Sequence, residues 1–315
     1  MLTLPTAAEV DAARARIAPY ALRTPLVGLD GVPGVYLKLE NLQPLGSFKI
    51  RPAINAMLSL GADRLARGVV TSSAGNFGQG LALAARELGV AATVVVPETS
   101  AATKTAALKA LGARVVRVPF DDWWTVMTAR RFEDADGVFI HPVAEQAVVA
   151  GNATIGAEIL EDLPEVDAII VPFGGGGLIS GIGSVMRRER PGVRMIAIES
   201  QASQPAAAAL AAGRPVKVTH DQSFVDGMGS TTVLDEMWPL VRRCVDEAAC
   251  ASFAQITEAI RLLAGRHHVI AEGAGAAPVA AALAGVGQGR IVCVISGGNI
   301  DPPKLGAILN GENPF

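Results

Sequence analysis

Cysteine and aromatic residues are scarce in this chain of 315 residues, which has three cysteines and 4% aromatic residues. Cys244, Cys250 and Cys293 do not follow a metal-binding spacing, and their odd number argues against a disulfide framework. An excess of charge of one sign is also missing, because 27 basic residues nearly balance 30 acidic ones. No basic block is interleaved with aromatic residues, so we expect no nucleic-acid partner.

Long apolar runs are absent as well. No stretch reaches the ~18–20 residues that a membrane-spanning helix needs. Residues 1–20 carry acidic residues among the basic ones and have no apolar core, unlike a secretory signal. Half of the residues are nevertheless hydrophobic, which is typical of a globular chain with a substantial core. We therefore expect a cytoplasmic protein without a membrane partner.

Strand-like and helix-like segments alternate from about residue 35 onward. The strand-like runs are mostly apolar and span residues 35–40, 68–70, 91–97, 113–119, 137–141, 167–172, 194–199 and 290–296. Segments with helical periodicity lie between them, at 78–88, 100–111, 144–161, 178–190, 205–213 and 251–264. This alternation predicts an α/β fold with parallel sheets covered by helices on both faces. Ligands of such sheets bind beyond the carboxyl ends of the strands, so the residues that follow each strand are the candidates for a binding site.

Four consecutive glycines occupy residues 174–177, in the segment VPFGGGGLISG. They follow a predicted strand and open a predicted helix, where converging backbone N–H groups can hold an anion. The segment has neither the Gly-Lys-Ser/Thr of a Walker loop nor the spaced glycines of a dinucleotide site. It predicts a phosphate-binding loop, with a flexible turn as the alternative, and it does not identify the phosphate compound.

Two further segments follow predicted strands. SSAGNFGQG at 72–80 predicts a helix start capped by Ser72 and Ser73. Its free N–H groups, with the amide of Asn76 beside them, can hold a carboxylate. VISGGNID at 294–301 places Ser296 at the same crevice, although a tight turn explains that pattern equally well.

Lys49 stands between Phe48 and Ile50 in the segment GSFKIRPA. Pro52 is unfavourable deep inside a helix, so a helix is predicted to begin near residues 48–51, with Lys49 at its start. A lysine with apolar neighbours serves either as a salt-bridge anchor or as a Schiff-base lysine with a lowered pKa. Combined with a phosphate-binding loop, it suggests a phosphorylated aldehyde, pyridoxal phosphate.

The segments KLENLQPLGSFKIRPA, SSAGNFGQG, GGGGLISG and SGGN, in this order, resemble motifs of fold-type II pyridoxal-phosphate enzymes. The resemblance covers nearly the whole chain and is to the threonine/serine dehydratase and serine racemase family. It implies a fold like that of tryptophan synthase β, with two domains that are open, mostly parallel sheets flanked by helices. The cofactor would lie in the cleft between a large domain (residues 1–66 plus 145–315) and a small mobile domain (residues 67–144).

The resemblance also implies roles for individual residues. Lys49 would be catalytic, linking to the cofactor and acting as the base at the substrate Cα. The cofactor would be bound by Lys49, Phe48, Asn76, Gly174, Gly175, Gly176, Gly177, Leu178, Gly227, Glu272 and Ser296. The substrate would be bound by Ser73, Ala74, Gly75, Asn76, Phe77 and Trp124. We assign no metal ligand, because Pro205 falls near where relatives with a cation site carry a second acid besides the one matching Glu199.

The expected activity is that of an ammonia-lyase, which converts L-threonine, L-serine or a related β-hydroxy amino acid to a 2-oxo acid and ammonia. Phe77 and Trp124 stand where relatives carry histidine and arginine, and Val143 stands where phenylalanine, asparagine or aspartate is expected. These departures suggest a substrate with an apolar β-substituent, so that threonine or a bulkier β-aryl serine such as phenylserine is preferred over 3-hydroxyaspartate. Ala74 lacks the hydroxyl that racemases use as a second base.

Three alternatives stay open at this point: a β-replacement transferase, a serine racemase of the same fold, and a phosphate-binding domain without catalytic activity. The resemblance further implies a homodimer or homotetramer.

Overall fold

The computed structural model describes residues 2–312 and Pro314, and the strands among them form two sheets. The larger sheet has the order β1 (Leu26–Gly28), β2 (Val35–Lys38), β10 (Ile291–Val294), β7 (Ala168–Pro172), β8 (Arg194–Ser200), β9 (Glu247–Ala251). The smaller sheet has the order β5 (Arg114–Val118), β4 (Ala92–Pro97), β3 (Val69–Ser72), β6 (Val138–Phe139). Neighbouring strands are parallel except β1 and β2. The predicted α/β fold with mostly parallel sheets is confirmed.

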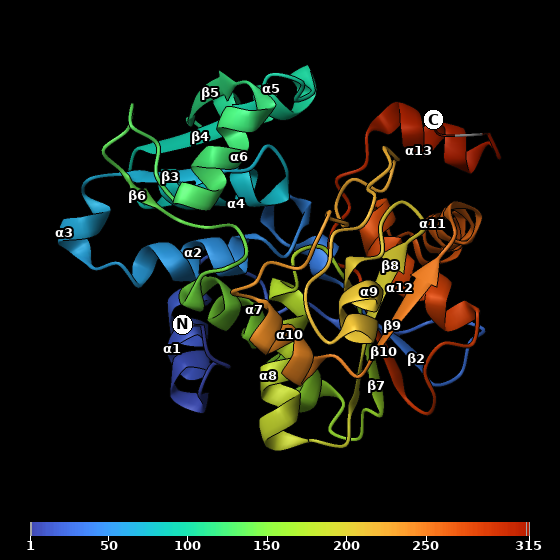
Figure 1. The fold of residues 1–315 in the computed structure, drawn as a ribbon. Helices are drawn as coiled ribbons and strands as arrows, with labels where there is room; N and C mark the ends of the chain where they lie inside the picture. The colour runs from blue at the N-terminus through green and yellow to red at the C-terminus, as the bar shows by residue number, and fades with distance from the viewer. Residues whose placement is uncertain (1, 313, 315) are drawn as a thin grey trace.

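Helices connect these strands (Figure 1). In the first half of the chain they are α1 (Ala7–Ile17), the 3-10 turns η1 (Glu40–Leu42) and η2 (Pro44–Gly46), α2 (Ile50–Leu58), α3 (Ala62–Leu65), α4 (Asn76–Glu87), α5 (Ala102–Ala110) and α6 (Phe120–Ala129). In the second half they are α7 (Gln146–Asp162), α8 (Gly177–Glu189), α9 (Pro205–Ala212), α10 (Trp238–Cys244), α11 (Phe253–His267), α12 (Gly273–Leu283) and α13 (Pro302–Leu309). No helix in the described part of the chain is long and apolar enough to cross a membrane.

The strand β7 shows why the larger sheet is covered on both faces. Side chains of a strand alternate between faces, and all five residues of β7 are buried. Ile169 and Val171 join the apolar cluster of α7, α8 and α10, whereas Ala168 and Ile170 join that of α11 and α12. A parallel strand buried on both faces needs a continuous apolar run, which is how the sequence predicted it.

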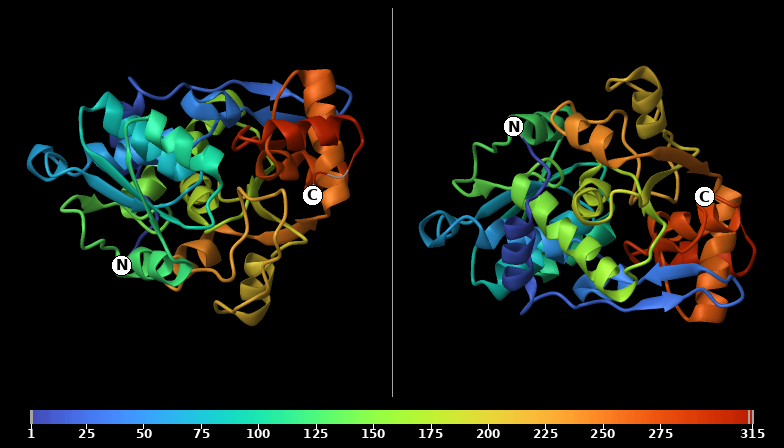
Figure 2. Two further views of the ribbon diagram at one scale, coloured as in Figure 1. Left: turned by 90° about the horizontal axis from the view of Figure 1, so that it is seen from above. Right: turned by 90° about the horizontal axis from the view of Figure 1, so that it is seen from below.

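The smaller sheet is covered by α4 on one face and by α6 on the other. The helix α2 packs between α4 and α7, because Ile50 and Ile54 share an apolar cluster with Phe77 of α4 and Val148 of α7. Figure 2 shows the smaller sheet on one side and the C-terminal helices on the other. The predicted domain limits stay a prediction, and their outer ends at residues 1 and 315 lie outside the described residues.

Two strands were missed by sequence analysis. The strand β1 has three residues, two of them exposed, so it carries no apolar pattern, and only its antiparallel pairing with β2 defines it. The strand β9 has the sequence EAACA, and alanine is depleted in strands. Its parallel pairing with the buried strand β8 stabilises it instead.

Candidate active site

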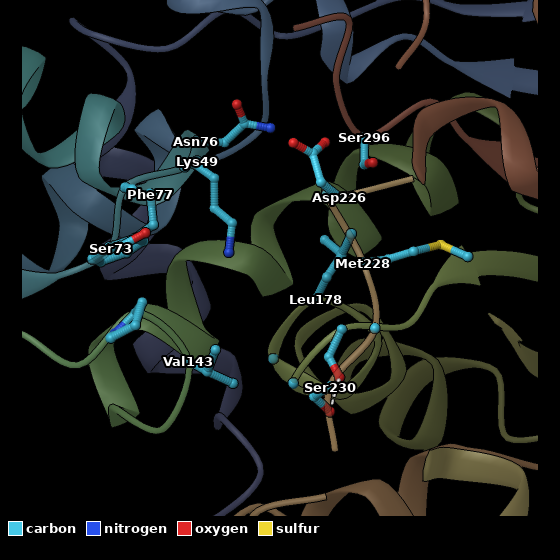
Figure 3. A pocket seen from close by; sticks show the side chains of 18 of the residues that line it. Lys49, Ser73, Asn76, Phe77, Val143, Leu178, Asp226, Met228, Ser230 and Ser296 are labelled. Carbon is cyan, nitrogen blue, oxygen red and sulfur yellow. Dashed lines mark hydrogen bonds between the residues drawn. The ribbon is translucent and has the colours of Figure 1, made fainter. Parts of the chain in front are cut away.

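A pocket of about 700 Å³ is lined by residues that follow β3, β6, β7 and β10, at the carboxyl ends of strands from both sheets. Every residue that the sequence assigned to cofactor or substrate lines this pocket, although most belong to segments far apart in the chain. Figure 3 shows the amine of Lys49 in the middle of the pocket, with Phe77 and Ser73 on one side and Leu178 and Met228 on the other.

Lys49 is the N-cap residue of α2, as the position of Pro52 predicted. The segment before it is paired with the residues that follow β10, since the N–H of Phe48 donates to the carbonyl of Ser296 at 3.0 Å. The N–H of Gly298 donates to the carbonyl of Gly46 at 2.8 Å, and Ser47 and Gly297 form an antiparallel bridge. These bonds hold Lys49 and Ser296 at fixed positions in one pocket.

Two glycines let neighbouring helices approach the start of α2. A Cβ atom on Gly80 of α4 would lie 2.9 Å from the carbonyl oxygen of Lys49. A Cβ atom on Gly151 of α7 would lie 2.6 Å from the Cα of Pro52. Backbone atoms cannot yield at such distances, so α4 and α7 hold the first turn of α2 in place.

The Lys49 amine lies 4.7 Å from the centre of the Phe48 ring and 5.6 Å from that of Phe77. Burial among these rings lowers the pKa of Lys49 to about 8, partly offset by the negative charge of Glu272. The neutral share of this amine near physiological pH is therefore far larger than that of an ordinary lysine, and a neutral amine is the form that reacts with an aldehyde.

Arg51, also in the first turn of α2, adds a buried charge network to the anchoring of this turn. Its guanidinium is buried and binds two buried carboxylates, Glu40 of η1 at 2.8 Å and Glu158 of α7 at 2.6 Å. Lys38 of β2 binds Glu158 as well, at 2.6 Å. Because every charge in this network is paired, it joins β2, η1, α2 and α7 without leaving a buried charge isolated.

The glycine loop between β7 and α8 has the geometry of an anion cradle. Gly176, the N-cap of α8, has φ 85°, and a Cβ there would lie 2.6 Å from the side chain of Val241. A Cβ on Gly174 would meet nothing closer than 3.8 Å, so the backbone there borders open space. The first N–H groups of α8 have no partner within their helix, and the buried Asn152 Oδ1 beside them has no partner among the described residues.

The loop at residues 72–76 differs from the prediction in one respect. The N-cap of α4 is Gly75, and no side chain caps the helix there. The hydroxyl of Ser72 donates instead to the carbonyl of Trp123 at 3.3 Å, so the predicted capping by Ser72 and Ser73 is wrong. The first N–H groups of α4 thus stay available to an anion in the pocket.

Glu272 is a buried carboxylate at the start of α12. It accepts hydrogen bonds from the Asn76 amide at 2.9 and 3.2 Å. A Cβ on either Gly227 or Gly297 would lie 2.8 Å from its Oε1, so the carboxylate is packed between two backbone segments. Burial raises the pKa of Glu272 to about 7, although the bond from Asn76 lowers it.

One wall of the pocket is apolar. The helix α6 contributes Phe120, Trp123, Trp124 and Met127, and the Phe120 and Trp124 rings both lie within about 6 Å of Trp123. The wall continues through Phe77 and Val143.

Val143 lies in a turn stabilised by His141, whose Nδ1 accepts from the N–H groups of residues 143 and 144 at 3.1 and 2.8 Å. Burial lowers the pKa of His141 to about 3, so this histidine is neutral.

Several residues of the pocket were not singled out from the sequence. Asn152, His220, Asp226, Met228, Ser230 and Asn299 all line it. Asp226 forms an ion pair with Lys104 of α5, which connects the loop after α9 to the smaller sheet. Asp226 directly precedes Gly227, and Asn299 follows Ser296 by three residues. Their position next to residues assigned to the site was the sequence signal that could have identified them. Asn152 and His220 had no such signal.

Glu199, whose position matches a cation ligand of some relatives, is buried next to the N-terminus of α9. Its carboxylate accepts from the N–H groups of Ala206 and Ala207 at 2.7 and 3.0 Å, at the N-terminus of α9. Burial raises the pKa of Glu199 to about 7. No cluster of potential metal ligands is found among the described residues.

These features fit pyridoxal phosphate. The glycine loop offers N–H groups for a phosphate, and Lys49 offers an amine of lowered pKa for an aldehyde. Asn76 and Ser296 provide a hydrogen-bond donor and a hydroxyl in the same pocket. A binding site for a cofactor with a phosphate, an aldehyde and a polar ring needs these groups.

Comparison with known proteins gives a consistent result. The family described as pyridoxal-phosphate dependent enzymes matches residues 17–297. An L-threonine ammonia-lyase from Thermotoga maritima is 41% identical over 281 residues, which are 88% of this chain and 70% of that protein. A maize serine racemase structure is 31% identical with a TM-score of 0.90, over 98% of each chain. A threonine deaminase structure from Solanum lycopersicum is 29% identical with a TM-score of 0.85, over 98% of this chain and 95% of that one. This chain therefore belongs to the pyridoxal-phosphate dependent enzymes of fold-type II.

Proposed function

We propose that this enzyme is an ammonia-lyase that converts L-threonine, L-serine or a related β-hydroxy amino acid to a 2-oxo acid and ammonia. The observation that carries the proposal is the amine of Lys49, which lies with lowered pKa in one pocket with the glycine loop at 174–177. The names of the relatives support the same reaction. Bound pyridoxal phosphate supplies an electron-withdrawing ring that acidifies the Cα–H of an amino acid joined to it.

Different residues of the chain then have different roles in the reaction. The neutral amine of Lys49 takes the proton from Cα, and the ring faces of Phe48 and Phe77 offset part of the cost of burying the resulting ammonium. The N–H groups at the start of α4, that of Asn76 among them, and Ser73 hold the substrate carboxylate. The side-chain amide of Asn76 would donate to the hydroxyl oxygen of the cofactor ring. Ser296 would present a neutral hydroxyl to the ring nitrogen, and a hydroxyl, unlike a carboxylate, would not hold a proton there. The ring would then withdraw electrons more weakly, which would favour departure of the β-hydroxyl over accumulation of negative charge at Cα.

Absorbance spectroscopy tests the assignment of Lys49. The purified enzyme should carry a visible absorbance band from lysine-linked cofactor. Lys49→Ala should lose that band, whereas Lys109→Ala, a change of an exposed lysine on α5, should retain it. A band that survives Lys49→Ala unchanged would overturn the proposal and would favour a binding domain without catalytic activity.

The reaction is tested by release of 2-oxo acid and ammonia from a panel of L-threonine, L-serine, L-threo-3-hydroxyaspartate and phenylserine. A second candidate substrate class, with a bulky apolar β-substituent, is favoured by the apolar wall of Phe77, Trp124 and Val143. Faster capture of the eliminated intermediate by an added thiol than by water would point to a β-replacement transferase. Formation of D-serine would point to a racemase, which Ala74 disfavours because it has no hydroxyl.

We also propose a cytoplasmic homodimer or homotetramer with a small domain of residues 67–144 that moves relative to the rest. The three free cysteines support a reducing compartment, and the resemblance to the dehydratase family supports the assembly. Lys104 belongs to the small domain and Asp226 does not, so their ion pair across the pocket supports a movement in which this contact forms as the small domain closes. Light scattering of the purified enzyme measures the assembly, and small-angle scattering with and without substrate measures the closure.

A further inference from the structure

The terminal amide of Asn299 bridges two loops of the pocket. Its Nδ2 donates to the backbone carbonyl of Leu45 at 2.7 Å and to the Oδ1 of Asn76 at 2.8 Å. Leu45 belongs to the turn that leads to Lys49 and has φ 62°, a left-handed conformation that is unusual for a leucine. Asn299 thus connects the lysine segment, the segment before α4 and the segment after β10.

The direction of both amides follows from the carbonyl of Leu45. Oxygen and nitrogen of an asparagine amide are interchangeable by shape, and only hydrogen-bond partners assign them. A backbone carbonyl oxygen only accepts, so the NH2 group of Asn299 must face Leu45. The same NH2 group faces Asn76, which must therefore present its oxygen to Asn299 and its NH2 group to the other side.

We propose that Asn299 is a positioning residue that fixes the Asn76 amide, so that Asn76 always turns its NH2 group toward the cofactor. This inference rests on the proposed function, in which Asn76 donates to the hydroxyl oxygen of the cofactor ring. One hydrogen of that NH2 group is directed at Glu272. The second hydrogen is left for an acceptor in the pocket.

Glu272 alone cannot fix this direction at neutral pH. An ionised carboxylate only accepts, but a protonated carboxyl also donates and would tolerate either orientation of the Asn76 amide. The charged groups near Glu272 are Lys49, Lys104 and Asp226, and burial in this setting raises its pKa to about 7. Glu272 therefore no longer fixes the orientation of the Asn76 amide once it is protonated. The hydrogen bond from Asn299 to Leu45 involves no titratable group, so it fixes that orientation at any pH.

The chemical consequence concerns the ring oxygen. A donor stabilises this oxygen as an oxyanion, whereas an acceptor in the same place favours the protonated hydroxyl. The two forms absorb at different wavelengths, so the bound cofactor reports which edge of the Asn76 amide it faces. The spectrum responds to this orientation even when turnover does not.

The experiment compares holoenzymes of the wild type, Asn299→Asp and Asn299→Ala by absorbance from pH 6 to pH 9, with the dissociation constant of the cofactor measured in parallel. A carboxylate at position 299 competes with Glu272 for the NH2 group of Asn76, and it turns the amide round where Glu272 is protonated and can donate to the amide oxygen. Asn299→Asp should therefore raise the pH midpoint of the absorbance change by about one unit and weaken cofactor binding about tenfold. Asn299→Ala should deviate from wild type only below about pH 7, where Glu272 is protonated.

Two controls distinguish a spectral change caused by the orientation of the Asn76 amide from one caused by added charge or by loosening of the loop. Asn310→Asp makes the same charge change at the exposed C-cap of α13 and should leave the spectrum unchanged. In an Asn76→Ala background, Asn299→Asp should have no further effect, because its path to the cofactor is gone. A shift of the same size in that background would overturn the inference, as would identical spectra for the wild type and Asn299→Asp.

Failure of the inference is distinguishable from failure of the proposed function. A wild-type enzyme that holds lysine-linked cofactor and releases 2-oxo acid, but whose spectrum ignores both substitutions at position 299, overturns only the role of Asn299. A wild-type enzyme without lysine-linked cofactor overturns the proposed function and this inference with it.

Discussion

The amine of Lys49 lies 4.7 Å from the centre of the ring of Phe48, its neighbour in the chain. Two consecutive side chains meet in this way because Lys49 is the N-cap of α2 and both residues line the same pocket. The apolar ring removes water from the amine while its π-electrons attract the ammonium form. Desolvation is the larger effect, and the pKa of Lys49 is lowered to about 8.

The first prediction concerns the rate at which the apoenzyme takes up pyridoxal phosphate. A lysine with a lowered pKa becomes neutral, and therefore reactive, as pH rises through that pKa. Uptake should increase with pH to a plateau, with its midpoint near 8, measured by stopped-flow absorbance. The same reaction with N-acetyl-lysine corrects for titration of the cofactor itself. A rate that keeps rising with pH in parallel with that of N-acetyl-lysine would show that the pocket does not lower the pKa of Lys49.

The second prediction compares two glycines of the phosphate loop. Gly176→Ala places a Cβ at φ 85° and 2.6 Å from Val241, so it should lower the free energy of unfolding of the apoenzyme by about 1–3 kcal/mol. Gly174→Ala meets nothing closer than 3.8 Å and should leave that free energy nearly unchanged. Both should weaken cofactor binding, because Gly176→Ala distorts the loop and the added methyl of Gly174→Ala projects into the space beside it. Urea unfolding and cofactor titration measure the two effects, and equal stability losses would contradict the geometry.

The third prediction concerns the buried charge network behind Lys49. Arg51→Met removes the cation between Glu40 and Glu158 and leaves buried carboxylates without sufficient partners. The free energy of unfolding should fall by about 3–5 kcal/mol. Arg131→Met is the matched control, because Arg131 is 74% exposed and its contact with Glu133 spans 3.7 Å. That control should change stability by less than about 0.5 kcal/mol, and similar losses for both variants would refute a special role of the network.

The fourth prediction tests the apolar wall. Replacing Trp124 by arginine introduces a cation at a position where some relatives carry one. The ratio of kcat/KM for 3-hydroxyaspartate to that for phenylserine should rise at least tenfold, because an ion pair with the second carboxylate replaces a contact with an aryl group. Trp238→Arg, at a helix start outside the pocket, is the control. A wild-type preference for 3-hydroxyaspartate over threonine would contradict the apolar pocket altogether.

The local pattern of the sequence was sufficient for those parts of the site that depend on neighbouring residues. Pro52 placed the start of α2 at Lys49, and four glycines between a buried strand and a helix predicted an anion cradle. The capping of α4 was mispredicted, because the Ser72 hydroxyl bonds to Trp123, 51 residues further along the chain. A propensity for helix caps cannot anticipate a competing partner that only the fold brings near.

The sequence by itself determined which chemical groups are present: a lysine among apolar residues, a glycine cradle, and a serine after the last strand. It also indicated that the lysine and the glycine cradle lie at helix starts. Only the tertiary structure decided how these groups act on one another. The pKa of Lys49 depends on Glu272 and Phe77, and the direction of the Asn76 amide depends on the carbonyl of Leu45 by way of Asn299. Desolvation and hydrogen-bond direction depend on the residues around a group, and the fold brings Asn299 to Leu45 and Asn76 from more than 200 residues away in the chain.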